Sequence, residues 1–198
     1  MPKYHKYVFD TDARRLVGDF EAMYGAEDRE AFDSWHSHDA RHMRLRLALT
    51  LIADLNFSNI LEVGCGKGTA AQFLKRSNNR VLGVDMAPTA IAKAKASFPD
   101  IEFRCLDARE IGSLAEQFDL VTFQAVLAYI DTWRELLATA AGMTDYVLVA
   151  EYVPANPIGM VKSVNELLSA FSEHFNVEHK LIYDDEVVIC LGRSRRGL

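Results

Sequence analysis

The sequence feature that most constrains the fold is an apolar run that ends directly in three alternating glycines. Residues 60–63 (ILEV) lead into Gly64, Gly66 and Gly68, and a helical pattern follows. Glycine lets the backbone turn tightly and come close to a ligand. The next apolar run ends in Asp85, and an acidic side chain at this place in a doubly wound sheet accepts hydrogen bonds from ribose hydroxyls. This segment therefore predicts a nucleoside-binding loop between the first strand and the first helix of an α/β core.

Short β-branched runs alternate with helical patterns through the rest of the chain. The expected strands are residues 59–63, 80–85, 101–106, 118–123, 145–151, 175–183 and 186–191. The expected helices between them begin near Lys67, Pro88, Asp131 and Val161. Strands that alternate with helices at this spacing predict parallel βαβ units with right-handed crossovers.

The last two runs depart from this alternation. Only Asp184 and Asp185 separate them, and so short a link forces an antiparallel hairpin, because a parallel crossover needs about a dozen residues. The fold class that we expect is therefore α/β: a doubly wound, Rossmann-like, seven-stranded sheet, mostly parallel, with a C-terminal antiparallel hairpin and an N-terminal helical cap. One reversed strand is expected near an edge of the sheet.

The N-terminal part of the chain lies outside the βαβ pattern and is rich in Tyr, His and Trp. We expect residues 1–44 to form a helical cap or lid over the ligand site, and residues 45–198 to form the core. Apolar spacing predicts helices over residues 12–24 and 39–55, the second with Asp39 as its N-cap.

Composition and charge limit the classes of partner. The 198-residue chain is 49% hydrophobic and has a formal net charge of −6, and its basic residues are scattered. Nucleic acid and anionic membranes need clustered Lys and Arg, so neither is expected as a partner. No apolar run approaches the ~20 residues of a membrane helix, and no signal peptide is apparent. Three cysteines that lie far apart indicate no disulfide framework, so we expect a cytoplasmic protein. We expect it to be a monomer or a homodimer.

The spacing of the glycines and a nearby carboxylate distinguish between nucleoside ligands. The dinucleotide fingerprint is G-x-G-x-x-G, whereas this loop has glycines at alternate positions. Glu62 stands two residues before Gly64, where a carboxylate repels a pyrophosphate and attracts an ammonium group. S-adenosylmethionine carries a ribose, an adenine and an ammonium group, so it suits this loop better than NAD does.

Four blocks of the chain resemble, in the same order, motifs of the class I S-adenosylmethionine-dependent methyltransferases. They are residues 62–68 (EVGCGKG), 84–86 (VDM), 105–108 (CLDA) and 118–123 (FDLVTF). The resemblance covers roughly residues 45–192. A narrower likeness to small-molecule enzymes of the nodulation N-methyltransferase type, and to sugar methyltransferases, rests on Trp35, Arg41 and residues 126–129.

The resemblance implies S-adenosylmethionine as the cofactor, with S-adenosylhomocysteine as its product, and a set of residues that bind it. Glu62 and the glycine loop would hold the methionine part, Asp85 the ribose, and Gln124 the amine through its carbonyl. Lys67 is expected to be solvated, and Cys65 to contribute its backbone N–H. Met86 could instead be part of the core, and Asp107 could cap a turn. The full set of implied cofactor residues is Trp35, Arg41, Glu62, Gly64, Cys65, Gly66, Gly68, Asp85, Met86, Asp107, Ala108 and Gln124.

Methyl transfer from a sulfonium depends on alignment and on exclusion of water more than on electrophilic help. A hydroxyl acceptor also needs a base near its proton, whereas a neutral amine can do without one. The residues expected near the acceptor, at the carboxyl edge of the sheet or in the cap, are His36, His38, Gln124, Tyr129, Glu151 and Tyr152. Of these, His36, His38, Tyr129 and Glu151 are the predicted catalytic residues. Core packing is an equal explanation for Tyr129, and simple exposure explains the histidines. No metal is expected, because His36, His38 and His42 lack a further clear ligand.

The function that we predict is an enzyme that transfers a methyl group from S-adenosylmethionine to an oxygen or nitrogen of a small molecule, such as a sugar, an amine or a secondary metabolite. The chain lacks the Asp/Asn-Pro-Pro-Tyr motif of amino-group DNA methyltransferases, the Pro-Cys pair of cytosine-C5 enzymes and any long insertion for a macromolecular substrate. The alternative is a non-catalytic protein that binds the cofactor as a sensor or partner subunit. An NAD-dependent oxidoreductase is less favoured, because of the loop spacing and the final hairpin. The identity of the acceptor stays open.

Overall fold

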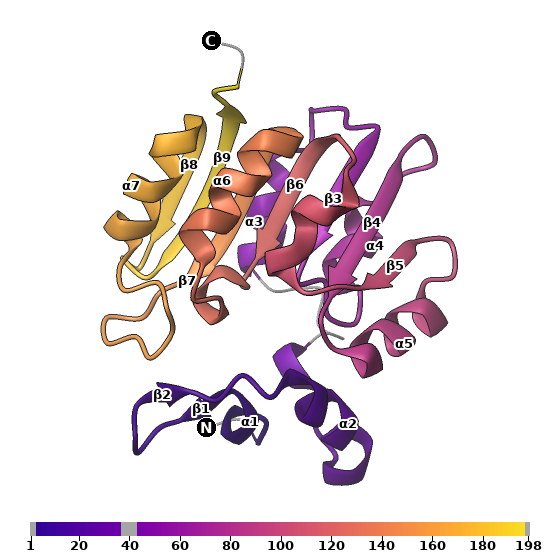
Figure 1. Cartoon of the computed structure of the whole chain (residues 1–198), viewed down its shortest axis with the longest axis vertical. Coiled ribbons are helices and arrows are strands. Elements are labelled where there is room, and N and C mark those ends of the chain that lie inside the picture. Colours follow the sequence, from indigo (N-terminus) through magenta and orange to yellow (C-terminus); the bar gives the residue numbers. More distant parts are fainter. Residues whose placement is uncertain (1–2, 37–42, 197–198) are drawn as a thin grey trace.

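The computed structural model describes residues 3–36 and 43–196, and its centre is a seven-stranded sheet (Figure 1). The strand order is β5-β4-β3-β6-β7-β9-β8. The strands are β3 (Asn59–Val63), β4 (Arg80–Asp85), β5 (Glu102–Cys105), β6 (Phe118–Gln124), β7 (Thr144–Tyr152), β8 (Phe175–Tyr183) and β9 (Val187–Ser194). Strands β3 to β7 run parallel, and β9 lies antiparallel between β7 and β8. The predicted doubly wound sheet, with one reversed strand beside an edge, is confirmed.

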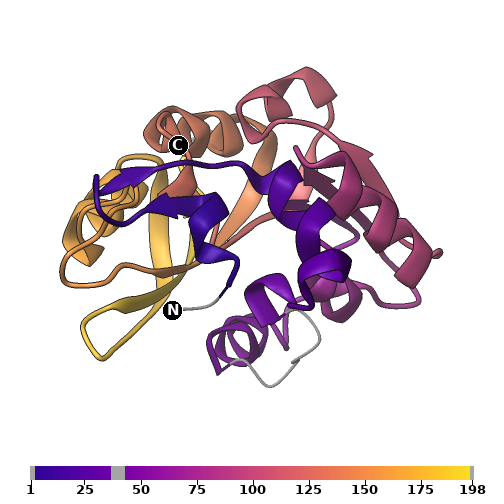
Figure 2. The same cartoon turned by 90° about the horizontal axis from the view of Figure 1, so that it is seen from below.

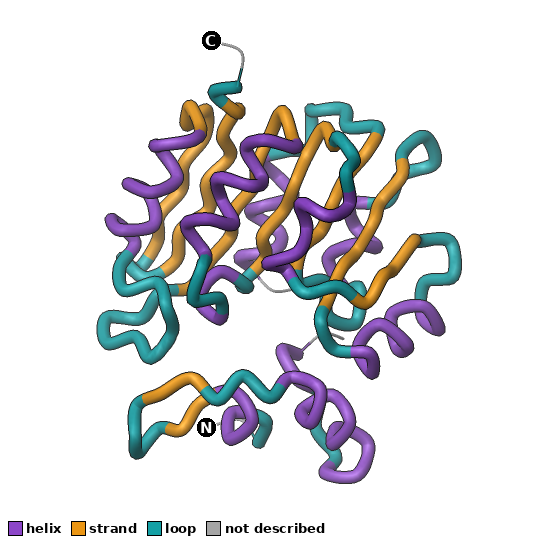
Figure 3. The backbone as a smooth tube through the Cα atoms, viewed as in Figure 1, coloured by secondary structure: helices purple, strands orange, loops and turns teal. Residues whose placement is uncertain are grey.

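Helices cover both faces of the sheet (Figures 1 and 3). One face carries α3 (Met43–Leu51), α4 (Thr69–Leu74) and α5 (Pro88–Ser97). The other face carries the 3₁₀ helix η2 (Ala108–Leu114), α6 (Trp133–Met143) and α7 (Val164–His174). A sheet that is buried on both faces explains why its central strands are continuous apolar runs. None of the helices in the described ranges has the length and apolar character that a membrane span requires.

A separate layer, the cap, lies below the carboxyl ends of the strands. It contains α1 (His5–Val8), β1 (Phe9–Asp10), β2 (Arg15–Leu16), α2 (Phe20–Glu30) and the 3₁₀ helix η1 (Ser34–His36). Seen from below, it crosses the open edge of the sheet (Figure 2). Met23 and Tyr24 are buried in this layer and pack with residues at the start of α5. The division into residues 1–44 and 45–198 stays a prediction.

The predicted helix over residues 12–24 is wrong. The chain forms the β1–β2 hairpin first, and α2 begins only after it. Arg14 (φ 49°) and Gly18 (φ 68°) adopt left-handed conformations, which interrupt a helix. The helix starts where the Asp19 carboxylate accepts a hydrogen bond from the Ala22 N–H at 3.1 Å.

The helix expected over residues 39–55 is shorter in the structure. Helix α3 ends at Leu51, because the N–H of Ile52 donates to the carbonyl oxygen of Leu49 (3.3 Å) in a tight terminal turn. The predicted N-cap, Asp39, lies outside the described residues.

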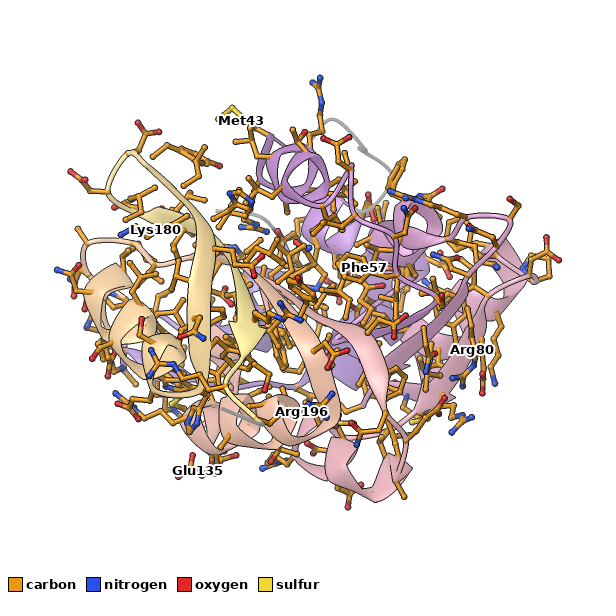
Figure 4. The ribbon with its side chains drawn as sticks, turned by 90° about the horizontal axis from the view of Figure 1, so that it is seen from above. Met43, Phe57, Arg80, Glu135, Lys180 and Arg196 are labelled. Carbon is orange, nitrogen blue, oxygen red and sulfur yellow. The ribbon has the colours of Figure 1, made fainter. Side chains whose placement is uncertain are left out.

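Ion pairs lie at the amino edge of the sheet, on the side away from the cap. Arg80, at the start of β4, pairs with Glu102 (2.7 Å) and with Glu116. Seen from above, Arg80 and Lys180 lie at opposite ends of the sheet (Figure 4). The carboxyl edge, by contrast, borders a cavity.

Candidate functional site

A cavity of about 280 Å³ lies between the carboxyl edge of the sheet and the cap. Ligands of open α/β sheets bind in a crevice at this edge. The predicted site residues that line the cavity are Trp35, Gly64, Asp85, Met86, Asp107, Ala108 and Tyr129. The structure therefore brings together predicted residues from the cap, the glycine loop and the segments that follow β4, β5 and β6.

The glycine loop after β3 is packed closely against its neighbours. Gly64 (φ 70°) and Gly66 (φ 52°) both adopt left-handed conformations. A Cβ at Gly64 would collide with Val126, and a Cβ at Gly66 would lie 2.7 Å from the hydroxyl oxygen of Tyr24 in α2. Both the conformation and the contacts therefore require glycine, and the cap helix touches the loop directly.

Asp85 is held in place at the end of β4 by two backbone hydrogen bonds. Its Oδ2 accepts from the N–H of Gly66 and its Oδ1 from the N–H of Ala87, each at 2.9 Å. Burial raises the pKa of Asp85, and the two N–H groups act against this rise. The carboxylate is thus oriented before any ligand binds.

Glu62 is a buried carboxyl group beneath the glycine loop. The residue is 2% exposed, and burial together with the nearby Asp85 raises the pKa of Glu62 to about 8. Among the described residues, three buried polar atoms have no hydrogen-bond partner: Glu62 Oε2, Thr122 Oγ1 and Gln124 Nε2. Glu62 lies opposite Thr122 in the β3–β6 pair, so these side chains share one face of the sheet. An unpaired buried acceptor destabilises the protein, and an ammonium group would supply the missing donor.

Several predicted cofactor residues in the described part of the chain do not line the cavity. They are Glu62, Cys65, Gly66, Gly68 and Gln124. The N–H of Cys65 donates to the carbonyl oxygen of Val84 (3.0 Å), and the N–H of Gly68 donates to that of Cys65 (2.9 Å). The backbone N–H that Cys65 was expected to contribute is therefore engaged with β4, and that of Gly68 is engaged within the loop.

Tyr129, in the 3₁₀ helix η3 (Leu127–Tyr129) after β6, joins this loop to the cap. Its ring centroid lies 5.5 Å from those of Phe20 and Trp35 and 5.9 Å from that of Phe9, which are favourable distances for aromatic pairs. Burial, and second the Glu151 carboxylate, raise the pKa of Tyr129 well above its ordinary value. Tyr129 therefore packs in an aromatic cluster and also lines the cavity.

Glu151, near the end of β7, is buried and does not line the cavity. Its Oε2 accepts a hydrogen bond from the N–H of Leu127 at 3.0 Å. Burial raises the pKa of Glu151 to about 7, and the positive charge of Arg44 opposes the rise. The carboxylate thus holds the loop that carries Tyr129.

The remaining predicted residues belong to the segment that connects the cap to α3. The side chain of His36, and the whole of His38 and Arg41, lie outside the described part of the chain. Within the described part, no group of three His, Cys, Asp or Glu side chains has an arrangement that could hold a metal ion.

The expectation that Lys67 is solvated is wrong. Its side chain is 9% exposed, and its Nζ pairs with Glu27 (2.6 Å) and Asp33 (2.5 Å) of the cap. Glu27 also pairs with Lys93 of α5 (2.8 Å) and accepts from the N–H of Ser34 (2.9 Å). Burial by itself would raise the pKa of Glu27, but the hydrogen bonds from Lys67, Lys93 and Ser34 lower it below its ordinary value. A buried ion network therefore ties the cap to the glycine loop and to α5.

Several cavity residues were not predicted from the sequence. They include Leu16, Phe20, Tyr24, Arg109, Ile130, Asp131 and Met160. The aromatic content of the cap was a usable signal for Phe20 and for Tyr24, whose hydroxyl accepts a hydrogen bond from the Trp35 indole. No sequence pattern around Met160 indicates a site residue, because it lies in a loop without a motif.

Strained backbone occurs on two sides of the cavity. Trp35 (φ 61°) and Ala125 (φ 56°) are non-glycine residues in the left-handed region, and both line the cavity. Such conformations persist only where the surrounding structure fixes them, and they are frequent at ligand sites. The strain therefore marks the same place as the glycine loop and Asp85 do.

Comparison with known proteins shows the class that this fold and site define. Residues 60–145 match the family model described as a methyltransferase domain. A ubiquinone biosynthesis O-methyltransferase of Methylobacterium sp. (strain 4-46) is 31% identical over 130 residues, which are 64% of this chain and 49% of that protein. A trans-aconitate 2-methyltransferase of Deinococcus radiodurans is 30% identical over 151 residues, which are 74% of this chain and 56% of that protein. The chain thus spans about half the length of these relatives.

A solved structure agrees with this class. The crystal structure of the N-methyltransferase NodS from Bradyrhizobium japonicum WM9, in complex with S-adenosyl-L-homocysteine, matches with a TM-score of 0.70 and 19% identity, over 87% of this chain and 98% of that chain. At this identity the likeness shows the fold, which is that of the Rossmann-like methyltransferases. Together with the family match over residues 60–145, it confirms the predicted resemblance to the class I S-adenosylmethionine-dependent methyltransferases.

Proposed function

We propose that this protein is an S-adenosylmethionine-dependent methyltransferase that acts on an oxygen or nitrogen atom of a small molecule. The observation that carries the proposal is the cavity, which joins Gly64, Asp85 and Asp107 beneath an aromatic cap. Relatives that are themselves O- and N-methyltransferases support the reaction class.

The residues around the cavity suit the chemical parts of S-adenosylmethionine. Asp85, already oriented by the N–H groups of Gly66 and Ala87, can accept hydrogen bonds from ribose hydroxyls. Glu62 does not line the cavity, but its unpaired oxygen beneath the glycine loop could accept a hydrogen bond from the ammonium group. Met86 is 48% exposed and lines the cavity, so its thioether offers an apolar surface to the adenine.

The chain itself contributes alignment and exclusion of water. The cofactor, when bound, would supply an electrophilic methyl group, with its sulfur as the leaving atom that keeps the electron pair of the broken bond. Phe20 and Trp35 of the cap line the cavity, so their apolar rings would limit the access of water to the reacting atoms. Tyr129 and the loop after β6 bound the space in which the acceptor is held in line with the methyl group.

An oxygen acceptor also loses a proton, and His36, His38, Tyr129 and Glu151 stay the candidates for the base. Tyr129 is supported by its place on the cavity wall. Glu151, with its pKa raised to about 7 by burial, is poised to exchange a proton near neutral pH. Its hydrogen bond from Leu127 and its absence from the cavity lining favour a positioning role instead.

The proposal extends to the setting of the enzyme. Residues 1–44 act as a cap or lid, and residues 45–198 form the cofactor-binding core. The position of the cavity beneath the cap supports a small acceptor, and the net charge of −6 supports neither nucleic acid nor a membrane surface as a partner. The three cysteines are free, which suits the reducing cytoplasm, and the protein acts as a monomer or homodimer.

Turnover separates this proposal from a sensor or partner subunit that binds the cofactor without catalysis. The purified protein is incubated with S-adenosylmethionine and a panel of sugar, amine and phenolic acceptors, and release of S-adenosylhomocysteine is measured. Release that depends on an acceptor supports the enzyme. Cofactor binding without turnover across the panel supports the sensor, and tight binding of NAD instead contradicts both.

A further inference from the structure

One wall of the cavity lies outside the contacts assigned to the cofactor, and it is apolar. It is formed by Leu16, Phe20, Tyr129, Ile130 and Met160. These residues come from the cap, from the loop after β6 and from the loop after β7. The two loops are joined by a hydrogen bond from the N–H of Met160 to the carbonyl oxygen of Ala128 at 2.7 Å. The apolar wall is therefore built from three separate parts of the chain that the fold fixes together.

The charges on the cavity disfavour an anionic acceptor. Arg109 is the only basic side chain among the described residues that line it. Arg109 pairs with Asp107 (2.6 Å) and lies 3.9 Å from Asp131. Two carboxylates thus take up this one positive charge, and Asp85 adds a third carboxylate. The described residues that line the cavity thus carry a net negative charge and include no unpaired basic side chain. A carboxylate or phosphate on the acceptor would therefore be repelled.

The apolar wall presents aromatic rings rather than aliphatic side chains alone. Phe20 and Tyr129 meet edge to face, with centroids 5.5 Å apart and ring planes at 70°. Aromatic faces and edges attract a further ring in offset or edge-to-face geometry, which an aliphatic ring of the same size cannot match. The thioether of Met160 adds a polarizable contact that also favours an aromatic partner.

The volume of the cavity limits the size of the acceptor. Pockets for drug-sized ligands have volumes of about 300–1,000 Å³. At about 280 Å³, this cavity is small for a nucleoside cofactor and a large acceptor together. With the cap in this position, the cavity favours a small acceptor.

We propose that the acceptor is an uncharged molecule with a single aromatic ring, which packs against Phe20, Tyr129 and Met160. The inference rests on the proposed function, because it assumes that the cofactor occupies the rest of the cavity. A hydroxyl on such a ring ionises near pH 10, as the tyrosine side chain does, so it demands less of a base than an aliphatic alcohol would.

Three small probes of matched shape test the proposal on the protein saturated with S-adenosylhomocysteine. They are catechol, cis-cyclohexane-1,2-diol, which lacks the aromatic ring, and 3,4-dihydroxybenzoate, which adds a carboxylate. Dissociation constants are measured by ligand-observed NMR titration. Catechol is expected to bind about two- to tenfold more tightly than the cyclohexanediol, from the contribution of one aromatic pair, and more tightly than the benzoate.

Two variants assign this preference to the apolar wall. Phe20→Leu keeps an apolar side chain but removes a ring from the wall, so the ratio between catechol and the cyclohexanediol should narrow. Phe9→Leu is the matched control. The ring centroid of Phe9 lies 5.9 Å from that of Tyr129, but Phe9 does not line the cavity. That variant should leave the ratio unchanged.

The outcomes separate the inference from the function on which it rests. If the protein binds S-adenosylhomocysteine but binds the cyclohexanediol or the benzoate at least as tightly as catechol, or does not bind catechol, the inference is overturned and the proposed function stands. An unchanged ratio in a folded Phe20→Leu variant also overturns it. If Phe20→Leu does not fold, the comparison of probes on the wild-type protein decides. A protein that does not bind S-adenosylhomocysteine contradicts the proposed function itself.

Discussion

The buried ion network between the cap and the core gives a prediction whose size follows from its geometry. Glu27 is 4% exposed, and its carboxylate bridges Lys67 (2.6 Å) and Lys93 (2.8 Å). Glu27→Gln keeps the shape of the side chain but removes the charge that both ammonium groups face. Loss of one partner from a buried ion pair costs about 3–5 kcal/mol. Because Lys67 retains Asp33, we expect the lower end of that range, about 3 kcal/mol.

Glu30, on the same helix, provides the matched control. It pairs with Lys6 at 2.7 Å, but the two side chains are 26% and 59% exposed. Glu30 also accepts a hydrogen bond from the Tyr7 hydroxyl at 2.7 Å. Because exposed pairs contribute little to stability, Glu30→Gln should destabilise the protein much less than Glu27→Gln does. In a protein of this size each kcal/mol lowers Tm by about 2–4 °C, so the expected loss is about 6–12 °C for Glu27→Gln, and the loss for Glu30→Gln should be clearly smaller.

Differential scanning calorimetry of the wild type and both variants measures these shifts, and pH provides a second check. The hydrogen bonds to Glu27 hold its pKa below the ordinary value of 4.5. Its contribution to stability is therefore present above about pH 4.5 and is lost as the pH falls through the folded-state pKa. The difference in Tm between the wild type and Glu27→Gln should therefore become smaller as the pH falls through that range. Equal Tm values for Glu27→Gln and Glu30→Gln at neutral pH would refute the claim that a buried network anchors the cap.

Three further predictions concern the site. Asp85→Ala removes a charged acceptor worth about 1.5–3 kcal/mol, so affinity for S-adenosylhomocysteine measured by calorimetry should fall about ten- to a hundredfold; an unchanged value in a folded variant removes Asp85 from the site. Burial raises the folded-state pKa of Glu62 from 4.5 to about 8, so folding takes up a proton between these values and stability falls as the pH rises through them. Urea unfolding at pH 5 and pH 8 should show this fall in the wild type, and Glu62→Gln should reduce it. Hydrogen exchange of residues 28–36 should slow when S-adenosylhomocysteine binds if the cap acts as a lid, and equal protection in both states would make this segment ordinary core.

The sheet could be predicted because each strand carries its own local signal. The bounds expected for residues 59–63, 80–85 and 175–183 are those of β3, β4 and β8. Apolar runs that are buried on both faces differ from helical spacing, and this difference is visible without any partner. The final hairpin followed from the length of its link alone.

The cap could not be predicted in the same way, because its conformation depends on single backbone positions and distant partners. The apolar residues of segment 12–24 fit a helical spacing, yet they belong to a hairpin and a helix that Gly18 separates. Lys67 was misplaced for a related reason. Its partners Glu27 and Asp33 precede it by 40 and 34 residues, and no local pattern shows that the fold brings them together.

In the site, too, the residues of a local motif could be predicted from the sequence, and the others could not. The glycine loop and Asp85 form a motif with fixed spacing, so the sequence predicted them, and the structure brings Gly64 and Asp85 to one cavity. The apolar wall has no such motif. Phe20 and Met160 come to line the same cavity only through the tertiary arrangement of the cap and the loop after β7, so they could be recognised as neighbours of one site only in three dimensions.

The central claim is that the cavity at the carboxyl edge binds S-adenosylmethionine and its product. Isothermal titration calorimetry of the wild-type protein with S-adenosylhomocysteine, and separately with NAD, tests it most directly. We predict saturable binding of one S-adenosylhomocysteine per chain and no comparable binding of NAD at the same concentrations. Tight binding of NAD, or no binding of S-adenosylhomocysteine by the folded protein, would contradict the claim.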